Sequence, residues 1–242
     1  MFKAMMTWIE DRERKLRRSF GKDISTPSGR FWGHVHYQIF DHAFLRVPWT
    51  NFFQIAPGVY RSNHPGPARL KRYRDMGIKS VITLRGEEKF AHYLFEKEAC
   101  EKLGLKFHVT KMWARNATKR ERIQAVLDAI RDVEKPFVFH CKSGADRAGI
   151  VAAMYLMVCE DVPVEEARAQ LGMKYLHMKW TKTGVQDYIL DVYEARKNAD
   201  PIDFETWLGT EYRAQRLNDA WDRRDSPAQC AQMLRDLALE NT

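Results

Sequence analysis

The sequence lacks the features that mark membrane-spanning, secreted and zinc-binding proteins. Its longest apolar run, residues 150–159, falls well short of the roughly 20 residues that a membrane-spanning helix needs, and is better explained as a buried helix. Dense charge begins at Glu10, so no apolar core or cleavage site of a secretory signal is expected. The four cysteines, at positions 100, 141, 159 and 230, show neither metal-ligand nor disulfide-framework spacing. We therefore expect a cytoplasmic protein with reduced thiols.

Positive charge is what the sequence has in excess. Its 40 Lys and Arg residues outnumber its 32 Asp and Glu residues, giving a net charge of +8. Such a charge favours anionic partners, namely nucleic acid, an acidic membrane surface or a phosphorylated molecule. No zinc-finger or aromatic ribonucleoprotein motif is present, so we expect no nucleic-acid partner. Peripheral contact with the anionic inner surface of a membrane is an alternative to a purely cytoplasmic location.

The first 50 residues are expected to form a basic, aromatic-rich helical extension. Met5, Ile9, Leu16 and Phe20 fall loosely on one helical face, with lysines and arginines around them. A second segment, residues 28–40, is rich in aromatic side chains and is also predicted to be helical. One interpretation is a basic amphipathic element that lies on an anionic membrane. The other, which the weak periodicity favours, is a helix that packs on the following domain with its charges in water.

Residues 51–200 alternate between strand and helix patterns. Short strands are predicted at 52–55 and 58–61 around a Pro-Gly turn, and buried strands at 79–84, 105–109 and 137–139. Helices are predicted at 67–76, 88–103 and 118–133. This alternation predicts an α/β fold of three layers, with a mostly parallel central sheet flanked by helices.

Beyond residue 147 the pattern is entirely helical. Helices are predicted at 148–160, from about 161–163 onwards, at 183–198 and at 204–224. Ser226 and Pro227 are expected to cap a last helix. The predicted organisation is a helical N-terminal extension (1–50), an α/β domain (51–200) and a C-terminal helical addition (201–242).

The segment HCKSGADRAG, residues 140–149, joins the strand predicted at 137–139 to the helix that follows it. A loop at such a junction turns its backbone N–H groups into one concavity at the positive end of a helix dipole, which suits a phosphate dianion. Gly144 permits the positive φ that a tight anion-binding loop needs. Cys141 is expected to react as a thiolate at the mouth of this loop, and the planar fork of Arg147 can hold two phosphate oxygens.

These residues match the H-C-x5-R signature, and residues 51–200 resemble the protein tyrosine phosphatase superfamily, closest to its dual-specificity and bacterial branches. The resemblance implies that Cys141 forms a phosphocysteine intermediate, that Arg147 binds the phosphoryl group and that His140 supports the thiolate. This route needs no metal or other cofactor, so none is predicted. The resemblance also implies a phosphate-binding loop made of Lys142, Ser143, Gly144, Ala145, Asp146 and Arg147.

The sequence departs from that superfamily in its general acid. Members usually take an aspartate from a loop well upstream of the cysteine, but the corresponding residues 110–120 contain no carboxylate. Asp146 is the nearest candidate to protonate the leaving group. It resembles the loop aspartate proposed as the acid in myotubularin-type lipid phosphatases and bacterial triple-specificity phosphatases. The alternative is that Asp146 only caps the helix that begins beside it.

Two further features bear on rate and substrate. Many relatives carry Ser or Thr after the arginine, where this chain has Ala148, so we expect phosphocysteine breakdown to be slower or assisted by Ser143. A cluster of cations would make the entrance strongly positive, as in relatives that use inositol phosphates or phospholipids; solvated surface charge is the alternative. These cations are Lys111, Arg115, Lys119, Arg120 and Lys142.

The predicted function is hydrolysis of a phosphate monoester on a phosphotyrosine or phosphoserine/threonine protein. A phospholipid or inositol phosphate at an anionic membrane is the alternative substrate, which Lys142, Asp146 and the basic N-terminus support. The alternative of another class is a phosphate-binding module without turnover, since the usual upstream acid is missing.

Overall fold

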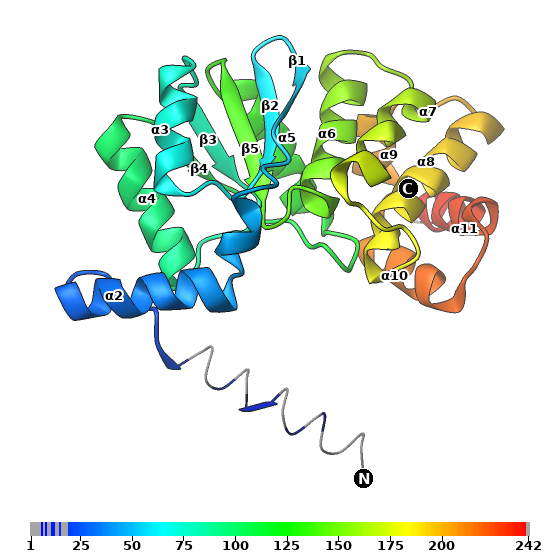
Figure 1. Cartoon of the computed structure of the whole chain (residues 1–242). Helices are drawn as coiled ribbons and strands as arrows, with labels where there is room; N and C mark the ends of the chain where they lie inside the picture. The colour runs from blue at the N-terminus through cyan, green and yellow to red at the C-terminus, as the bar shows by residue number, and fades with distance from the viewer. Residues whose placement is uncertain (1–5, 7, 9–10, 13–14, 16–18, 241–242) are drawn as a thin grey trace.

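The computed structural model describes residues 6, 8, 11–12, 15 and 19–240. Within these residues one sheet has the strand order β1-β2-β5-β3-β4. The first two strands pair antiparallel, and the other neighbours pair parallel, as the sequence predicted (Figure 1). The strands are β1 (Phe53–Ala56), β2 (Val59–Asn63), β3 (Ser80–Thr83), β4 (Lys106–Val109) and β5 (Phe137–Cys141).

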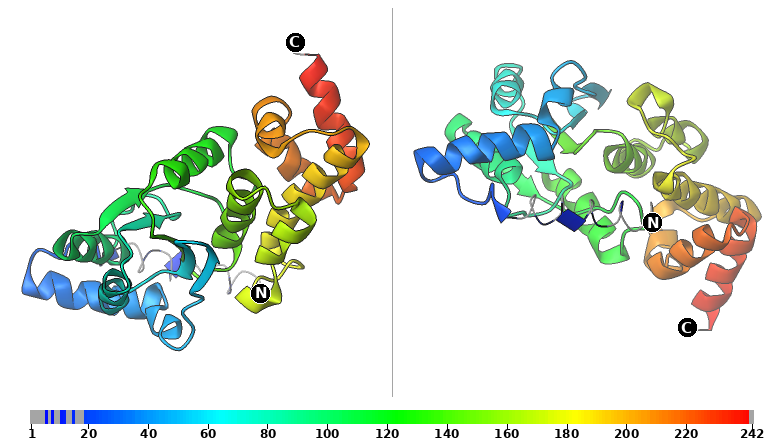
Figure 2. Two further views of the ribbon diagram at one scale, coloured as in Figure 1. Left: turned by 90° about the horizontal axis from the view of Figure 1, so that it is seen from above. Right: turned by 60° about the horizontal axis from the view of Figure 1, so that its bottom comes forward.

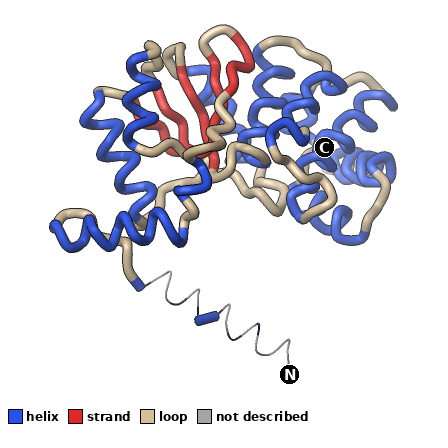
Figure 3. The backbone as a smooth tube through the Cα atoms, viewed as in Figure 1, coloured by secondary structure: helices blue, strands red, loops and turns tan. Residues whose placement is uncertain are grey.

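Helices cover both faces of the sheet, which confirms the three-layer α/β fold (Figure 3). These helices are α3 (Pro67–Asp75), α4 (Ala91–Leu103), α5 (Arg120–Asp132) and α6 (Asp146–Cys159). Alternate residues of a strand point to opposite faces. Val81 and Val138 are therefore buried with α3 and α4, whereas Ile82 and Phe139 are buried with α5 and α6. All of β5 is buried, so the strand that ends at Cys141 is held from both sides.

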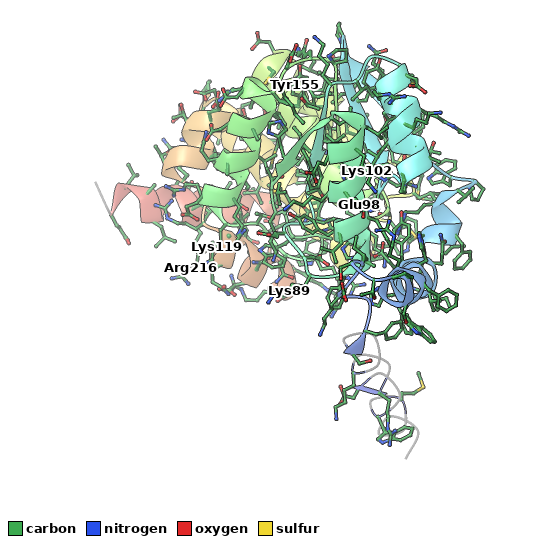
Figure 4. All side chains as sticks on the ribbon, turned by 90° about the vertical axis from the view of Figure 1, so that its left-hand side faces the viewer. Lys89, Glu98, Lys102, Lys119, Tyr155 and Arg216 are labelled. Carbon is green, nitrogen blue, oxygen red and sulfur yellow. The ribbon has the colours of Figure 1, made fainter. Side chains whose placement is uncertain are left out.

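The predicted helix at 28–40 is present and packs on the α/β domain. It comprises α2 (Pro27–Val35) and a π-helical turn, η1 (His36–Phe40), and is followed by the 3-10 turn η2 (Ala43–Arg46). Tyr37 is buried against Phe95 of α4, and Arg30 pairs at 2.8 Å with Glu98, which Figure 4 labels on α4. This arrangement agrees with the interpretation that the weak periodicity favoured. Of the apolar face expected at the N-terminus, Met5, Ile9 and Leu16 lie outside the described residues, whereas Phe20 packs edge-on against Trp32 of α2.

The chain after β5 is helical, as predicted. Its helices after α6 are α7 (Val164–Ala167), α8 (Val185–Ala199), α9 (Phe204–Thr210), α10 (Ala214–Arg223) and α11 (Pro227–Leu239). Trp207, Leu217 and Leu234 are fully buried in the same core as α6 and α8. Ser226 forms a capping box with Gln229, which confirms the predicted start of the last helix. The domain boundaries at residues 50 and 200 stay predictions.

The prediction of one helix over 204–224 is wrong, because the chain leaves the helix between α9 and α10. Glu211 there is buried against Arg196, with a nitrogen–oxygen distance of 2.8 Å. The next residue, Tyr212, is also buried and donates a 2.6 Å hydrogen bond to the carbonyl of Thr118. These two buried polar contacts outweigh the local preference for a continuous helix. None of the described helices combines the length and hydrophobicity that crossing a bilayer needs.

Candidate functional site

The loop between β5 and α6 has the geometry of an anion cradle. Cys141 ends the buried strand and is itself only 1% exposed. Gly144 has a φ of +74°, and its backbone N–H donates to the Cys141 sulfur at 3.3 Å. The helix α6 begins at Asp146, so its unpaired N–H groups and dipole face the same loop. The sulfur therefore lies beside groups that stabilise negative charge.

Buried side chains from distant elements hold the carbonyl side of this loop. Arg61 on β2 is fully buried and donates to the carbonyls of Gly144 at 2.7 Å and Ala145 at 3.2 Å. Burial lowers its pKa to about 10, so it stays protonated at neutral pH. Asn51 donates its side-chain N–H to the carbonyl of Ser143 at 3.1 Å. With their carbonyls bound on the outside, successive loop amides are available to an anion on the inside.

His140 is held from behind by Glu96 of α4. The His140 Nε2 atom lies 2.5 Å from a Glu96 carboxylate oxygen, and both side chains are almost fully buried. The His64 Nδ1 atom lies 3.6 Å from the other carboxylate oxygen of Glu96. Burial lowers the pKa of His64 well below its usual value, and the positive charge of Arg85 lowers it further. The donor atoms of His64, Glu96 and His140 lie within 4.8 Å of one another, as those of a metal site would. The facing atoms of His64, Glu96 and His140 are buried and make no hydrogen bond among the residues that the structure describes. Glu96 contacts the residue before Cys141, so we interpret the group as a support for the loop.

Asp146 has a partner that the sequence did not reveal. Its carboxylate lies 2.8 Å from His177 Nδ1, and His177 Nε2 lies 2.6 Å from Asp187. Burial alone would lower the pKa of His177, but the hydrogen bonds to Asp146 and Asp187 raise it to about 9. His177 therefore carries both ring protons at neutral pH. No side chain of the described residues makes a capping hydrogen bond at the start of α6. Asp146 therefore stabilises this helix only through the interaction of its negative charge with the helix dipole.

Arg147 lies in a cavity of about 330 Å³ with Lys111 and Arg115. Its Nε atom is buried and makes no hydrogen bond to any described residue. A buried guanidinium nitrogen without a partner is costly, and a bound oxyanion would satisfy it. The residues of the predicted upstream acid loop thus supply cations to this cavity rather than a carboxylate.

Lys142 of the loop lies 3.7 Å from Asp41. Asp41 follows η1 and binds Arg85 through both carboxylate oxygens, at 3.0 and 2.8 Å. Burial alone would raise the pKa of Asp41, but the adjacent Arg85 guanidinium holds it well below its usual range. Asp41 of the N-terminal extension therefore contacts both the loop and Arg85, a role that no sequence pattern indicated.

Two of the predicted entrance cations lie elsewhere. Arg120 donates to the carbonyl of Tyr212 at 3.0 Å, and Lys119 lines a groove of about 1020 Å³ formed with α10. Figure 4 labels Lys119 on this side of the molecule, together with Arg216 of α10. Neither residue lines the cavities that contain Arg147 or the loop residues, so the structure does not bring these two cations to the entrance.

Three carboxylates line the cavities that adjoin the loop in the described part of the chain: Asp41, Glu88 and Asp146. Arg85 keeps Asp41 ionised, as described above. Burial alone would raise the pKa of Glu88, but a hydrogen bond from His92 lowers it. Asp146 differs from both, since its partner His177 holds a proton that it can pass on.

Comparison with known proteins identifies the family. A family model described as "PTP-SAK: Swiss Army Knife protein, DSP-PTPase phosphatase domain" matches residues 60–186. The chain belongs to this family. The matched region runs from β2 to the start of α8, so the phosphatase domain includes the loop, Asp146 and His177.

Solved structures of phosphatases are similar to this chain at low identity. P. aeruginosa TpbA is 16% identical, covers 77% of this chain and 92% of its own, and has a TM-score of 0.43. The core catalytic domain of the PP-IP phosphatase SIW14 from S. cerevisiae is 16% identical, covers 64% and 96%, and has a TM-score of 0.46. No curated protein matched the sequence. The family match, rather than these likenesses, carries the assignment to a phosphatase domain.

Proposed function

We propose that the phosphatase domain hydrolyses phosphate monoesters through a phosphocysteine on Cys141. The observation that carries this proposal is the position of the Cys141 sulfur, 3.3 Å from the Gly144 amide in the loop that leads into α6, whose first turn holds Arg147. In the first step the sulfur attacks phosphorus, a sulfur–phosphorus bond forms, and the bond to the leaving oxygen breaks. The loop amides and Arg147 hold the equatorial oxygens as charge develops on them.

Asp146 delivers the proton to the leaving oxygen in this proposal, and His177 supplies it. The proton passes from His177 Nδ1 to the Asp146 carboxylate and on to the leaving group, and His177 keeps its Nε2 proton on Asp187. In the second step water attacks phosphorus and the sulfur–phosphorus bond breaks. The proton of that water returns through Asp146 to His177, so phosphate and the free alcohol are the products.

Steady-state hydrolysis of an aryl phosphate by the whole chain tests the proposed reaction. Cys141→Ser is expected to abolish turnover, whereas Cys159→Ser, a cysteine on the far part of α6, is expected to retain it. A chelator is expected to leave the rate unchanged. If wild type binds vanadate but does not turn over, the phosphate-binding module is the correct description. If Cys141→Ser keeps the wild-type rate, the phosphocysteine route is wrong.

The role of Asp146 has a separate test. An alkyl leaving group needs protonation far more than an aryl one, so Asp146→Asn is expected to reduce kcat on an alkyl phosphate about 10²-fold or more and on an aryl phosphate much less. Equal losses on both substrates would contradict an acid role. The sequence prediction of a phosphotyrosine or dual-specificity protein substrate stays a prediction.

A further inference from the structure

Large apolar side chains are exposed in two short segments beside the loop. The first segment precedes β1 and the second lies between α7 and α8, and both lie near the lower end of β5 in Figure 1. Val47 is 76% exposed and Trp180 is 70% exposed. We call the eight exposed side chains the apolar rim: Phe44, Leu45, Val47, Trp49, Met173, Leu176, Met178 and Trp180.

The two segments of the apolar rim meet at the phosphate loop. The Asn51 side chain donates to the carbonyl of Ser143 in the loop at 3.1 Å and to the carbonyl of Tyr175 at 2.9 Å. The same loop residue, Ser143, shares a cavity of about 510 Å³ with Leu176 and Met178. Figure 2 shows the blue to cyan part of the chain that leads into the sheet and the yellow part before α8 in two further views. The apolar rim therefore borders the entrance to the proposed active site.

The backbone holds these side chains in water. Arg46, between Leu45 and Val47, turns inward and pairs with Asp41 at 2.7 Å. Tyr175 is buried with the guanidinium carbon of Arg61 3.8 Å from its ring centroid. The next residue, Leu176, has a φ of +59°, a left-handed conformation that is costly for a residue with a branched side chain. Anchors on both segments thus prevent the apolar side chains from folding back onto the core.

The segments that supply the rim carry cations and no carboxylates, and the carboxylates beside them, Asp41 and Asp146, are paired with Arg46 and His177. Residues 42–74 and 167–186 contain the apolar rim, and residues 102–120 contain Arg115. None of the 32 Asp and Glu residues of the chain falls within these three ranges. Lys174, Lys179 and Lys182 alternate with the apolar residues of the second segment. Cations interleaved with exposed Trp, Leu and Met match the interface of a bilayer, where lipid phosphates and acyl chains lie a few ångströms apart.

We propose that the apolar rim docks on an anionic phospholipid bilayer, so that the loop hydrolyses a phosphate monoester on a lipid headgroup. This inference rests on the proposed function and names its substrate class. A soluble inositol phosphate would need the cations but not the exposed apolar side chains. The proposed membrane contact lies at residues 44–49 and 173–180, not in the basic N-terminal residues that the sequence analysis considered as an alternative.

The test compares the whole chain with two double variants on vesicles of phosphatidylcholine, with and without phosphatidylserine. Val47→Ser with Trp180→Ser removes two rim side chains that line none of the cavities at the loop. Met76→Ser with Leu239→Ser is the matched control, because these residues are 55% and 68% exposed but lie outside the rim. Vesicle co-sedimentation measures binding. Hydrolysis is measured on a vesicle-borne phosphatidylinositol phosphate and on a soluble aryl phosphate.

We expect wild type and the control to bind phosphatidylserine vesicles and the rim variant to bind them about tenfold more weakly. The rim variant should lose activity on the vesicle-borne lipid by a similar factor and keep its activity on the aryl phosphate. If wild type does not hydrolyse the aryl phosphate at all, the proposed function itself is refuted.

Three other outcomes would overturn the membrane inference while leaving the reaction intact. If wild type hydrolyses the aryl phosphate but binds no vesicle, the apolar rim does not dock on a membrane. A second outcome is that wild type and the rim variant bind vesicles equally while the double variant Arg12→Glu, Lys15→Glu loses vesicle binding. That result would place the membrane contact at the N-terminus instead of the rim. A rim variant that loses activity only on a phosphotyrosine protein would identify the rim as a protein-docking surface.

Discussion

Replacing His177 with glutamine removes the charge that bridges Asp146 and Asp187, and its effect on stability should depend on pH. The folded protein raises the pKa of His177 from 6.5 to about 9. At about 1.4 kcal/mol for each pKa unit, this shift corresponds to at most about 3 kcal/mol of stability. The two carboxylates are 20% and 23% exposed, so water weakens the pairs, and we expect about 2 kcal/mol.

The sign follows from the direction of the shift. Because the folded-state pKa lies above the unfolded value, the contribution is complete below pH 6.5 and is lost as the pH rises through about 9. We compare the free energy of unfolding of wild type with that of His177→Gln. The excess of wild type should be about 2 kcal/mol larger below pH 6.5 than above pH 9. Urea unfolding followed by tryptophan fluorescence measures this difference.

His108→Gln is the matched control, since burial lowers the pKa of His108. Its contribution to stability is present above the unfolded pKa and is lost as the pH falls, so the wild-type advantage over this variant should change in the opposite direction. A difference between wild type and His177→Gln that is the same at both ends of the pH range would refute the charged bridge, and with it the proposed source of the catalytic proton.

Three further substitutions, one of them with a control variant, test the loop and the core. Arg147→Lys keeps the charge but loses the two-pronged contact, so kcat/KM on an aryl phosphate should fall about 10²-fold with KM raised; an unchanged kcat/KM would remove Arg147 from the site. Gly144→Ala would place a Cβ atom 2.7 Å from the backbone nitrogen of Asn63 and should abolish activity, whereas Gly77→Ala, also at positive φ but with nothing within 4 Å, should cost about 1 kcal/mol of stability and keep activity. Trp207→Ala should lower the free energy of unfolding by about 3–5 kcal/mol, since Trp207 is fully buried; a loss under 1 kcal/mol in urea would show that α9 is not part of the core.

Local sequence patterns were sufficient to predict the sheet, its helices and the loop after β5. β-branched and apolar runs mark strands whether or not their partners are known, and Gly144 and Pro227 act on their own backbone. The single helix predicted over 204–224 was wrong because a local pattern does not record distant contacts. The contacts that break this helix involve Thr118 and Arg196 from other elements.

The residues that support the site could not be predicted, since the fold brings them from far along the chain. Glu96 reaches His140 from α4, and His177 reaches Asp146 from 31 residues further on. Asn51 and Arg61 bind backbone carbonyls of the loop, and such contacts leave no motif in the sequence. The absence of carboxylates from residues 110–120 was visible, but only the folded chain places a protonated histidine behind Asp146.

The most direct test of the central claim is a rapid acid quench of the whole chain during turnover of an aryl phosphate, followed by peptide mass spectrometry. The account predicts one phosphoryl group on the peptide that contains Cys141. Its yield should be substantial, because Ala148 offers no hydroxyl to speed breakdown. A burst of the aryl product equal to the enzyme concentration should accompany it. Full turnover with no phosphoryl group on Cys141 and no burst, or with the group on another residue, would contradict the account.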